Sequence, residues 1–224
     1  MSDHAAKVRI YEQFARIGKA VAAPARLELV DLLLQGERSV DALARETQMS
    51  MANASQHLQV LLAARLVDTR RDAQRIYYRI AASQVLDLWL AVRRTAEAQL
   101  AELPGVARDY LGDPDAFRPI DREELARRLD AGTVVLIDVR PVEEFEQGHI
   151  AGAVSVPITE IKSWARDHAP RRKQIVAYCR GPYCVYARQA VAELRKQGRR
   201  AMPLGDGVTE WRTAGYHVTT GGTP

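Results

Sequence analysis

A break in apolar periodicity at residues 112–116 divides this 224-residue chain into two halves with different patterns. Before the break, apolar residues recur mostly at the spacing of a helix. After it, short apolar runs alternate with helical patterns, which predicts an α/β domain with a parallel sheet covered by helices on both faces. The sequence therefore predicts two domains, residues 1–111 and 119–224, joined by a linker at 112–118.

The first half reads as a mainly α helix-turn-helix followed by a β-hairpin. Helical spacing predicts a helix over residues 24–36, a second from Ser39, and a third that begins at the N-cap residue Ser50. Past Leu66 the spacing changes from near 3.6 to near 2, which predicts a hairpin over residues 66–80 with its turn at residues 72–73.

Two amphipathic segments flank these elements. One is the N-terminal segment, and the other is a long helix predicted from Ser83 to the Pro104 and Gly105 pair. Their apolar stripes suit the seam of a homodimer, and packing within one subunit is the alternative. The stripes consist of Val8, Tyr11, Phe14, Ile17 and Val21, and of Val85, Leu88, Trp89, Val92, Ala96, Leu100 and Leu103.

The formal net charge of +4 is compatible with nucleic-acid binding but does not require it. The local distribution says more, because four arginines gather in the hairpin within ten residues and only Asp72 lies among them. They are Arg70, Arg71, Arg75 and Arg79. Phosphate neutralisation is the functional interpretation, and ordinary surface charge is the alternative.

Both cysteines of the chain lie in residues 179–184, between an apolar run at 175–178 and a helical pattern at 184–197. Backbone N–H groups that converge at the start of a helix stabilise an anion and lower the pKa of a cysteine held there. Cys179 is therefore the candidate nucleophile. The alternative is that Cys179 and Cys184 are two small buried apolar residues.

Composition excludes several classes of protein. No window approaches the 18 uncharged apolar residues of a membrane span, and the N-terminus lacks a signal-type apolar core, so we expect a cytoplasmic protein without a membrane partner. Cytosolic thiols stay reduced, which favours a catalytic or redox-sensing role for the cysteines over a structural disulfide. No metal-finger spacing occurs, and no metal or cofactor is expected.

Residues 1–103 resemble the ArsR family of winged-helix repressors. The resemblance rests on residues 24–30 in the scaffold helix, 55–61 in the recognition helix and 75–80 on the wing. It implies a homodimer that binds a double-stranded DNA operator, with the third helix in the major groove and the wing arginines on phosphate or in the minor groove. The candidate base-reading residues are Asn53, Ser55, Gln56, His57 and Gln59, for which simple solvation is the alternative.

Members of this family commonly sense metals or metalloids through cysteines on the helix before the turn, or through His and acidic residues on the dimerising helix. Here residues 41–45 contain no cysteine and residues 84–103 no histidine. The familiar metal sites are therefore missing, and the sulfur nucleophiles lie in the second half.

Residues 118–220 resemble a single rhodanese domain through several motifs, at 136–140, 143–145, 148–153, 179–184, 205–211 and 215–216. Asp138 and Arg140 are expected to form a supporting ion pair at the end of a buried strand. Gly148, Gly152 and Gly207 are expected to allow tight turns.

The rhodanese resemblance implies that Cys179 accepts a sulfane sulfur from a donor such as thiosulfate or a persulfide. Loop N–H groups would hold the terminal sulfur, and the loop residues are Arg180, Gly181, Pro182, Tyr183 and Cys184. The chain departs from the usual pattern at the sixth loop position, where arginine is frequent and this chain has Cys184. That residue is a candidate resolving thiol, or else a buried residue at the helix start.

Two functions from different classes fit these residues. The first is a repressor whose rhodanese domain senses reactive sulfur by persulfidation of Cys179, resolved by Cys184. The second is an active sulfurtransferase with an autoregulatory DNA-binding domain. A weaker alternative is a metalloid sensor that uses Cys179 and Cys184 as two thiolate ligands.

Overall fold

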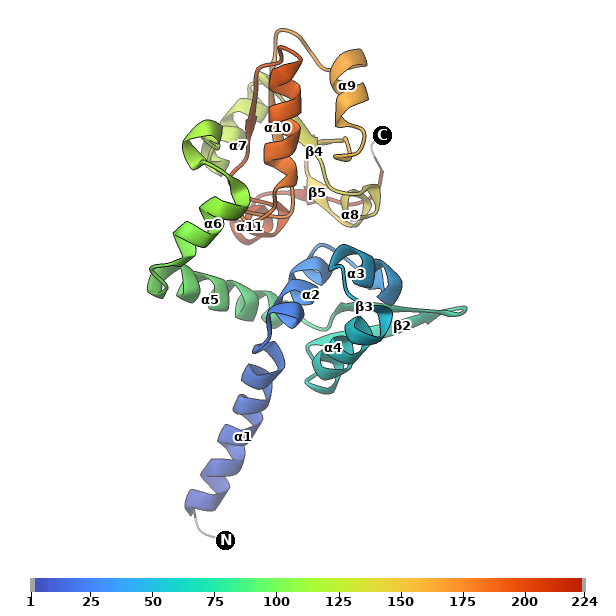
Figure 1. The fold of residues 1–224 in the computed structure, drawn as a ribbon, viewed down its shortest axis with the longest axis vertical. Coiled ribbons are helices and arrows are strands. Elements are labelled where there is room, and N and C mark those ends of the chain that lie inside the picture. Colours follow the sequence, from blue (N-terminus) through green and yellow to red (C-terminus); the bar gives the residue numbers. More distant parts are fainter. Residues whose placement is uncertain (1–2, 223–224) are drawn as a thin grey trace. The chain divides into compact units, whose positions relative to one another are not determined.

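The structure, a computed structural model, describes residues 3–222 apart from the side chains of residues 114 and 115, and Figure 1 shows its elements. The chain forms two compact units, Met1–Gln99 and Leu100–Pro224, each with its own apolar core. The boundary between the two units falls at residues 99–100 of the sequence, whereas the sequence predicts a linker at 112–118. The exact limits of the domains stay a prediction. No helix among the described residues is long and apolar enough to cross a membrane.

The first unit packs helices against a small antiparallel sheet with strand order β1-β3-β2. Its centre is apolar, with Leu29, Leu43, Leu58 and Leu61 fully buried. The predicted helix-turn-helix and hairpin are confirmed. The elements are α1 (Asp3–Val21), α2 (Pro24–Leu34), β1 (Arg38–Ser39), α3 (Val40–Glu46), α4 (Met51–Ala63), β2 (Val67–Asp72), β3 (Arg75–Ile80) and α5 (Ser83–Gln99).

Serine N-caps begin both helices, at Ser50 as predicted and at Ser39, where the sequence predicts a helix start. The Ser39 hydroxyl accepts a hydrogen bond from Ala42 N at 3.4 Å, and the Ser50 hydroxyl accepts one from Asn53 N at 3.2 Å. Each bond satisfies one N–H group that a helix start leaves without a partner. These caps fix where α3 and α4 begin.

The predicted helix from Ser83 to Pro104 is wrong at its C-terminal end. Helix α5 ends at Gln99, and Pro104 lies in the first turn of a separate helix, α6 (Leu103–Leu111). Proline is tolerated there because the first N–H groups of a helix have no intrahelical partner. Leu100 and Leu103 therefore lie outside α5.

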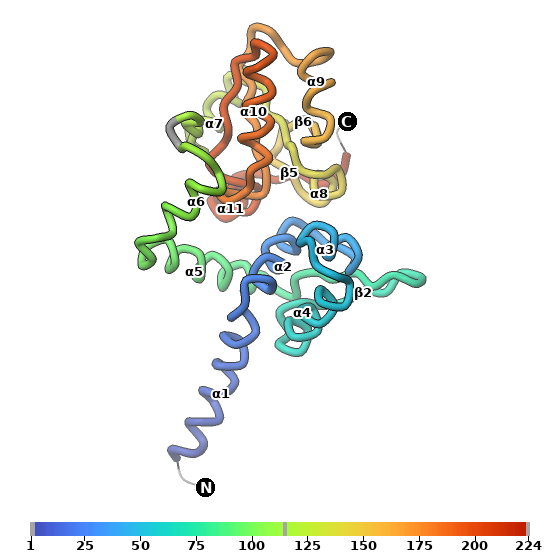
Figure 2. The backbone as a smooth tube through the Cα atoms, viewed as in Figure 1, coloured from blue at the N-terminus to red at the C-terminus, as the bar shows by residue number. Residues whose placement is uncertain are grey.

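The hairpin of β2 and β3 projects beyond α4 as a narrow two-stranded arm in Figure 2. Its turn lies at residues 73–74, one position later than predicted, because Asp72 pairs with Arg75. Ala73 adopts a φ of 51°, an uncommon value for a residue with a Cβ atom. Strand β1, which extends the sheet through Arg38 and Tyr78, was not predicted.

The second unit is built on a parallel sheet with strand order β6-β4-β7-β8, and its described helices lie on both faces, as predicted. Successive strand residues face opposite sides: Ile137 packs with residues of α9 and α10, and Leu136 with residues of α7 and α11. The strands are β4 (Val134–Asp138), β6 (Val154–Ser155), β7 (Gln174–Tyr178) and β8 (Ala201–Pro203). The helices are α6, α7 (Arg122–Asp130), α8 (Val142–Gln147), α9 (Ile161–Asp167), α10 (Tyr186–Lys196), α11 (Val208–Thr213) and the short 3₁₀ turn η1 (Pro114–Phe117).

A second, two-stranded sheet pairs β5 (His149–Ile150) with β9 (Val218–Thr219) and was not predicted. The His149 Nε2 atom lies 2.7 Å from the Thr219 hydroxyl, and the imidazole ring stacks on Phe145 at 3.6 Å. Two-residue strands are too short to show a period of two, so a sequence pattern cannot reveal them.

Candidate thiol site and nucleic-acid interface

The cysteine loop begins where β7 ends. Cys179 is the first residue after Tyr178, and the loop runs into α10 at Tyr186. Asp138, the last residue of β4, pairs with Tyr178 across the sheet, so the two strand ends bring Asp138 and the loop to the same edge. In open α/β sheets this carboxyl edge is where ligands bind.

The two cysteines are free thiols in contact with each other. Cys179 is buried, with 3% of its surface exposed, and Cys184 is half-buried. The Cys179 thiol donates to the Cys184 carbonyl oxygen at 3.4 Å and also to the Cys184 sulfur. The main-chain N–H groups of Gly181 in the loop and of Ala187 in α10 act to lower the pKa of Cys179. That the loop amides hold a terminal sulfur stays a prediction.

The expected lowering of the Cys179 pKa is wrong for this form of the protein. Burial raises the pKa of Cys179 well above its ordinary value, because the thiolate would lose hydration that the amides only partly replace. The hydrogen bond from Cys179 lowers the pKa of Cys184, and the charge of Arg180 acts in the same direction. Of the two thiols, Cys184 is therefore the one that ionises more readily.

A cavity of about 170 Å³ lies over the two sulfur-bearing residues. Gly181 and Pro182 of the loop line it, together with Arg188 of α10. The other lining residues are apolar or glycine, and they are Phe117, Pro119, Ala187, Pro203, Leu204 and Gly205. Tyr183, by contrast, is partly exposed at 38%.

Arg180 serves the scaffold in this structure. Its guanidinium donates to Glu144 at 2.6 and 3.0 Å, and Glu144 is fully buried. The expected ion pair of Asp138 and Arg140 is also present, at 2.6 Å, with Arg140 Nη1 lying 3.8 Å from Glu144. Two carboxylates and two guanidiniums thus form one buried network that fixes the first half of the loop to the sheet.

Gly207 and Glu210 support the loop from its other side. A Cβ atom on Gly207 would lie 2.7 Å from Gly181 N and closer still to the Arg180 carbonyl. The φ of Gly207 is −112°, so the reason for glycine here is close backbone approach and not the tight turn that the sequence suggested. Glu210 accepts a hydrogen bond from Gly207 N at 2.9 Å.

Sequence reasoning missed the structural roles of Glu144, Glu210 and Arg188. Glu144 and Glu210 stand inside the motifs already noted, but the sequence does not indicate which residues their carboxylates contact. Arg188 follows Cys184 by four residues, the spacing at which side chains on a helix are neighbours. That spacing was the available signal for Arg188.

The recognition helix α4 buries Ala54, Leu58 and Leu61 and turns its polar residues outward. Asn53 and Gln56 are exposed, and Ser55 and His57 are half-buried. The Gln59 amide donates to the Tyr78 hydroxyl at 3.1 Å, so this candidate reader is tied to the hairpin.

The four hairpin arginines do not form one patch. Residues paired across β2 and β3 share a face, and the pairs of Arg70 with Tyr77, Arg75 with Asp72, and Arg79 with Asp68 lie on one face. Arg70 there bonds Glu37 at 2.7 Å and Asp72 at 3.3 Å.

Arg71 lies on the opposite face of the hairpin. It pairs with Ile76, and that face also carries Tyr78, which reaches Gln59 of α4. Arg71 is therefore on the side of the recognition helix, whereas much of the charge of Arg70 is balanced by nearby carboxylates.

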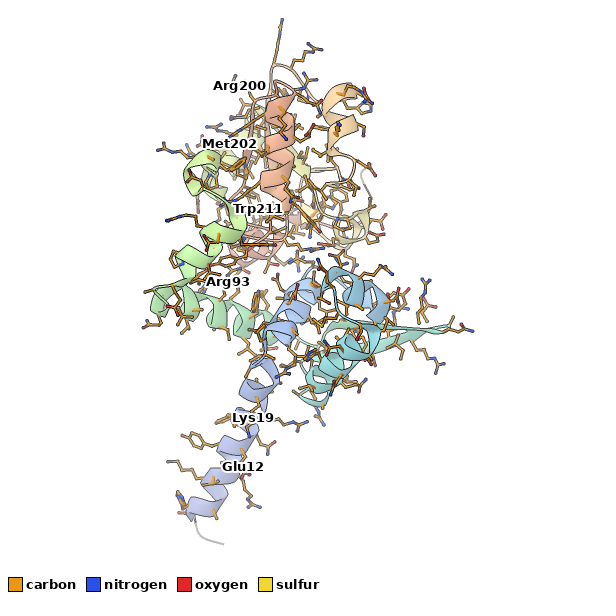
Figure 3. The ribbon with its side chains drawn as sticks, in the orientation of Figure 1. Glu12, Lys19, Arg93, Arg200, Met202 and Trp211 are labelled. Atoms are coloured by element: carbon orange, nitrogen blue, oxygen red, sulfur yellow. The ribbon has the colours of Figure 1, made fainter. Side chains whose placement is uncertain are left out.

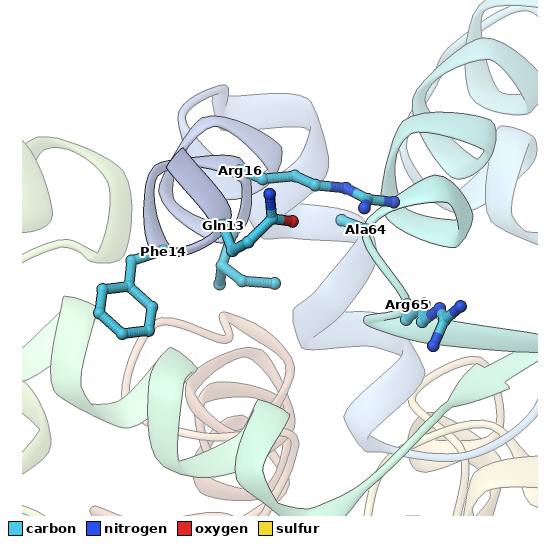
Figure 4. A pocket seen from close by; sticks show the side chains of 6 residues that line it. Gln13, Phe14, Arg16, Ala64 and Arg65 are labelled. Carbon is cyan, nitrogen blue, oxygen red and sulfur yellow. The ribbon is translucent and has the colours of Figure 1, made fainter. Parts of the chain in front are cut away.

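Helix α1 leaves the N-terminal part of its apolar stripe exposed in the single chain, whereas Ile17 and Val21 pack against the core. Tyr11 and Phe14 are exposed at 59% and 65%. An open groove of about 480 Å³ lies between α1 and the end of α4, and Figure 4 shows Phe14 and Arg16 on one side of it and Ala64 and Arg65 on the other. Glu12 and Lys19, labelled in Figure 3, line a neighbouring hollow of about 400 Å³ on the same helix.

No group of three or more His, Cys, Asp or Glu side chains that could hold a metal ion occurs among residues 3–222 as described.

Two family models match the chain. The model of bacterial regulatory proteins of the arsR family matches residues 23–69, and that of the rhodanese-like domain matches residues 121–214. The HTH-type transcriptional regulator Rv0324 of Mycobacterium tuberculosis is 46% identical over 215 residues, which cover 96% of this chain and 94% of that protein. The likeness thus spans both units in the same order.

Two further proteins match one unit each. A sulfurtransferase of Allochromatium vinosum is 36% identical over 101 residues, which cover 44% of this chain and 92% of that protein. The solution structure of the homodimeric winged helix-turn-helix DNA-binding domain of Mb0332 from Mycobacterium bovis is 43% identical, covers 46% of this chain and 93% of that one, and has a TM-score of 0.42.

Proposed function

This chain belongs to the ArsR family of transcriptional regulators and carries a rhodanese-like domain; on that basis we propose that it is a dimeric repressor whose cysteine loop senses reactive sulfur. The observation that supports this best is the pair of free, hydrogen-bonded thiols beside a cavity at the carboxyl edge of the sheet. As a regulator of transcription it would act in the cytoplasm.

The first chemical step is sulfur transfer to Cys179. Once Cys184, the more readily ionised thiol, has lost its proton, it takes the proton of Cys179, and the Cys179 sulfur attacks the sulfane sulfur of thiosulfate. The sulfur–sulfur bond of the donor breaks, and sulfite leaves with the electron pair. Cys179 is left as a persulfide anion.

The second step resolves the persulfide. The proton returns from Cys184 to the terminal sulfur, and the Cys184 thiolate attacks the Cys179 sulfur. The bond to the terminal sulfur breaks, and hydrosulfide leaves with the electron pair and the proton. The sulfane sulfur is thereby reduced and the two thiols are oxidised to a disulfide, so no other oxidant is needed.

The exposed stripe on α1 supports a dimer, because a second copy would cover Tyr11 and Phe14. In that dimer two copies of α4 would read base edges through Asn53, Ser55, Gln56 and His57, and the hairpins would contact phosphate.

Cys179→Ser is expected to abolish both persulfide capture and release of DNA. With a DNA fragment selected by the reduced protein, the affinity of the wild type should fall about tenfold or more after a persulfide donor, a typical size for coupling between two sites. The variant should bind equally before and after the donor. Fluorescence anisotropy at fixed salt measures the affinity.

Cys184→Ser is the matched control for this experiment. It should still gain one sulfur atom on Cys179 in the mass spectrum, more slowly because the thiol that takes the Cys179 proton is missing, and form no link between the two residues. A Cys179→Ser protein that still releases DNA in response to the donor would contradict the proposal.

Arg71→Ala is expected to weaken DNA binding and to reduce the slope of log affinity against log salt by about one, the loss of one phosphate contact. Arg75→Ala should act in the same direction. Arg70→Ala is the control, with a smaller change in slope because Glu37 and Asp72 already balance its charge. If Arg71→Ala and the wild type have equal slopes of log affinity against log salt, the hairpin does not contact DNA phosphate.

An active sulfurtransferase with an autoregulatory DNA-binding domain is the second candidate, and the likeness of 101 residues of this chain to a sulfurtransferase favours it. The two functions differ in turnover, because a sensor needs one modification and an enzyme must pass sulfur to an acceptor repeatedly. Steady-state transfer from thiosulfate to cyanide, with Cys179→Ser as the blank, separates them. Rapid turnover would favour the enzyme.

A further inference from the structure

Arg188 connects the cysteine cavity to the segment that precedes the rhodanese sheet. Its side chain lines the cavity with Cys179 and Cys184, and its Nη1 donates to the Leu111 carbonyl at 3.2 Å. Leu111 is the last residue of α6. The same guanidinium therefore borders the thiols and holds the end of a helix far from them in sequence.

The charge inside the cavity is set by this residue. Among the described lining residues, Arg188 is the one with a permanently charged side chain, and walls such as Phe117 and Leu204 are apolar. The volume of about 170 Å³ has room for roughly five or six water-sized groups. The cavity thus fits a small anion and excludes most of a peptide-sized persulfide.

The bond from Arg188 to Leu111 is one that an anion can displace. A neutral carbonyl at the end of a helix is a weaker acceptor for a guanidinium than a charged oxygen is, because charge-assisted hydrogen bonds are roughly twice as strong as neutral ones. A low-polarity wall increases that difference. An anion beside the thiols would therefore take the guanidinium from Leu111.

A second arginine on the same helix holds the same segment without reaching the thiols. Arg195 donates to the Ala116 carbonyl at 2.8 Å and stacks over the Phe117 ring at 5.3 Å. It is not among the residues that line the cavity. Helix α10 thus binds residues 111–117 through two arginines, Arg188 near one end and Arg195 near the other. Of the two, Arg188 is the one that borders the cysteines.

We infer that Arg188 recognises the anionic end of a small sulfur oxyanion in the cysteine cavity and, in doing so, releases the carbonyl end of α6. The inference rests on the proposed sulfur-sensing function and assigns the residue that recognises the donor and the first relay of its regulation. Because only residues 100–102 separate α5 from α6, the released helix is the one that directly follows the DNA-binding unit in the chain.

The test uses the full-length Cys179→Ser protein, which can bind thiosulfate but cannot accept its sulfur. Thiosulfate should bind it, and hydrogen exchange of the Gly112 amide, which bonds Arg108 at the end of α6, should become faster on binding. Adding Arg188→Gln should weaken thiosulfate binding about tenfold or more, the loss expected for one charge-assisted hydrogen bond. Exchange at Gly112 should then be fast with or without the anion.

Arg195→Gln in the same background is the matched control. It should speed exchange at residues 112–117 as well, but leave thiosulfate affinity unchanged, because Arg195 lies outside the cavity. Equal thiosulfate affinity with and without Arg188 would overturn the inference, as would an unchanged Gly112 amide on binding. Neither measurement depends on sulfur transfer or on DNA, so either failure is distinguishable from failure of the proposed function.

Discussion

Asp138→Ala is expected to lower the free energy of unfolding of the second unit by about 3–5 kcal/mol, the usual cost of removing one partner from a buried ion pair. Asp138 accepts bonds from Arg140 Nε at 3.0 Å and from Arg140 Nη2 at 2.6 Å, and neither residue is exposed. Without Asp138 the buried Arg140 guanidinium would lose its closest carboxylate. Its remaining contacts would be the Gly148 carbonyl at 2.7 Å and a Glu144 oxygen at 3.8 Å.

Urea unfolding measured by tryptophan fluorescence checks this result. In a Trp89→Phe background the two remaining tryptophans, Trp164 and Trp211, both report on the second unit. Asp167→Ala is the control, because its pair with Arg166 has nearly the same length, 2.7 Å, but is exposed, and exposed pairs contribute little. Equal midpoints for the two variants would show that the buried network does not stabilise the fold.

Gly207→Ala is expected to displace the cysteine loop and to cost about 1–3 kcal/mol or more, as overpacking of a close contact does. The new Cβ atom would meet backbone atoms of Arg180 and Gly181, which cannot rotate away as a side chain can. Because Arg180 is held by Glu144, the displacement should fall on the part of the loop that carries the N–H donors. Capture of sulfur by Cys179 should fall at least about tenfold, since catalytic geometry tolerates little misplacement.

Gly205→Ala is the control for stability, because its Cβ atom would make an ordinary contact with Pro119 at 3.5 Å. Its midpoint in urea should match that of the wild type. If Gly207→Ala unfolds like Gly205→Ala and captures sulfur at the normal rate, the loop does not depend on this close approach.

The longer helices and strands could be predicted from the sequence, because they show a clear apolar period or a clear start. The Ser39 and Ser50 caps mark α3 and α4, and the apolar run at 134–138 is long enough to indicate a buried strand. The end of α5 could not be predicted, because Pro104 both stops helices and starts them, and local sequence does not say which.

The place of the candidate site in the fold could be predicted from the sequence, but the electrostatics of its residues could not. The loop, Asp138 and Arg140 all lie at one edge of the sheet, as parallel strand ends require. The order of ionisation could not be predicted, because it depends on how deeply Cys179 is buried and on which thiol donates to the other. The division of the hairpin arginines follows from the pairing register, which a turn one residue longer or shorter would reverse.

The cysteine loop is held much more firmly on one flank than on the other. Arg180 is anchored to buried Glu144, whereas Pro182 and Cys184 border empty volume. Bulk added at sulfur, as a single atom or as a cross-link, therefore pushes the trailing part of the loop and the first turn of α10 and leaves the leading part in place. The direction of the displacement is thus set by the fold, and chemically different adducts on sulfur would displace the same part of the chain.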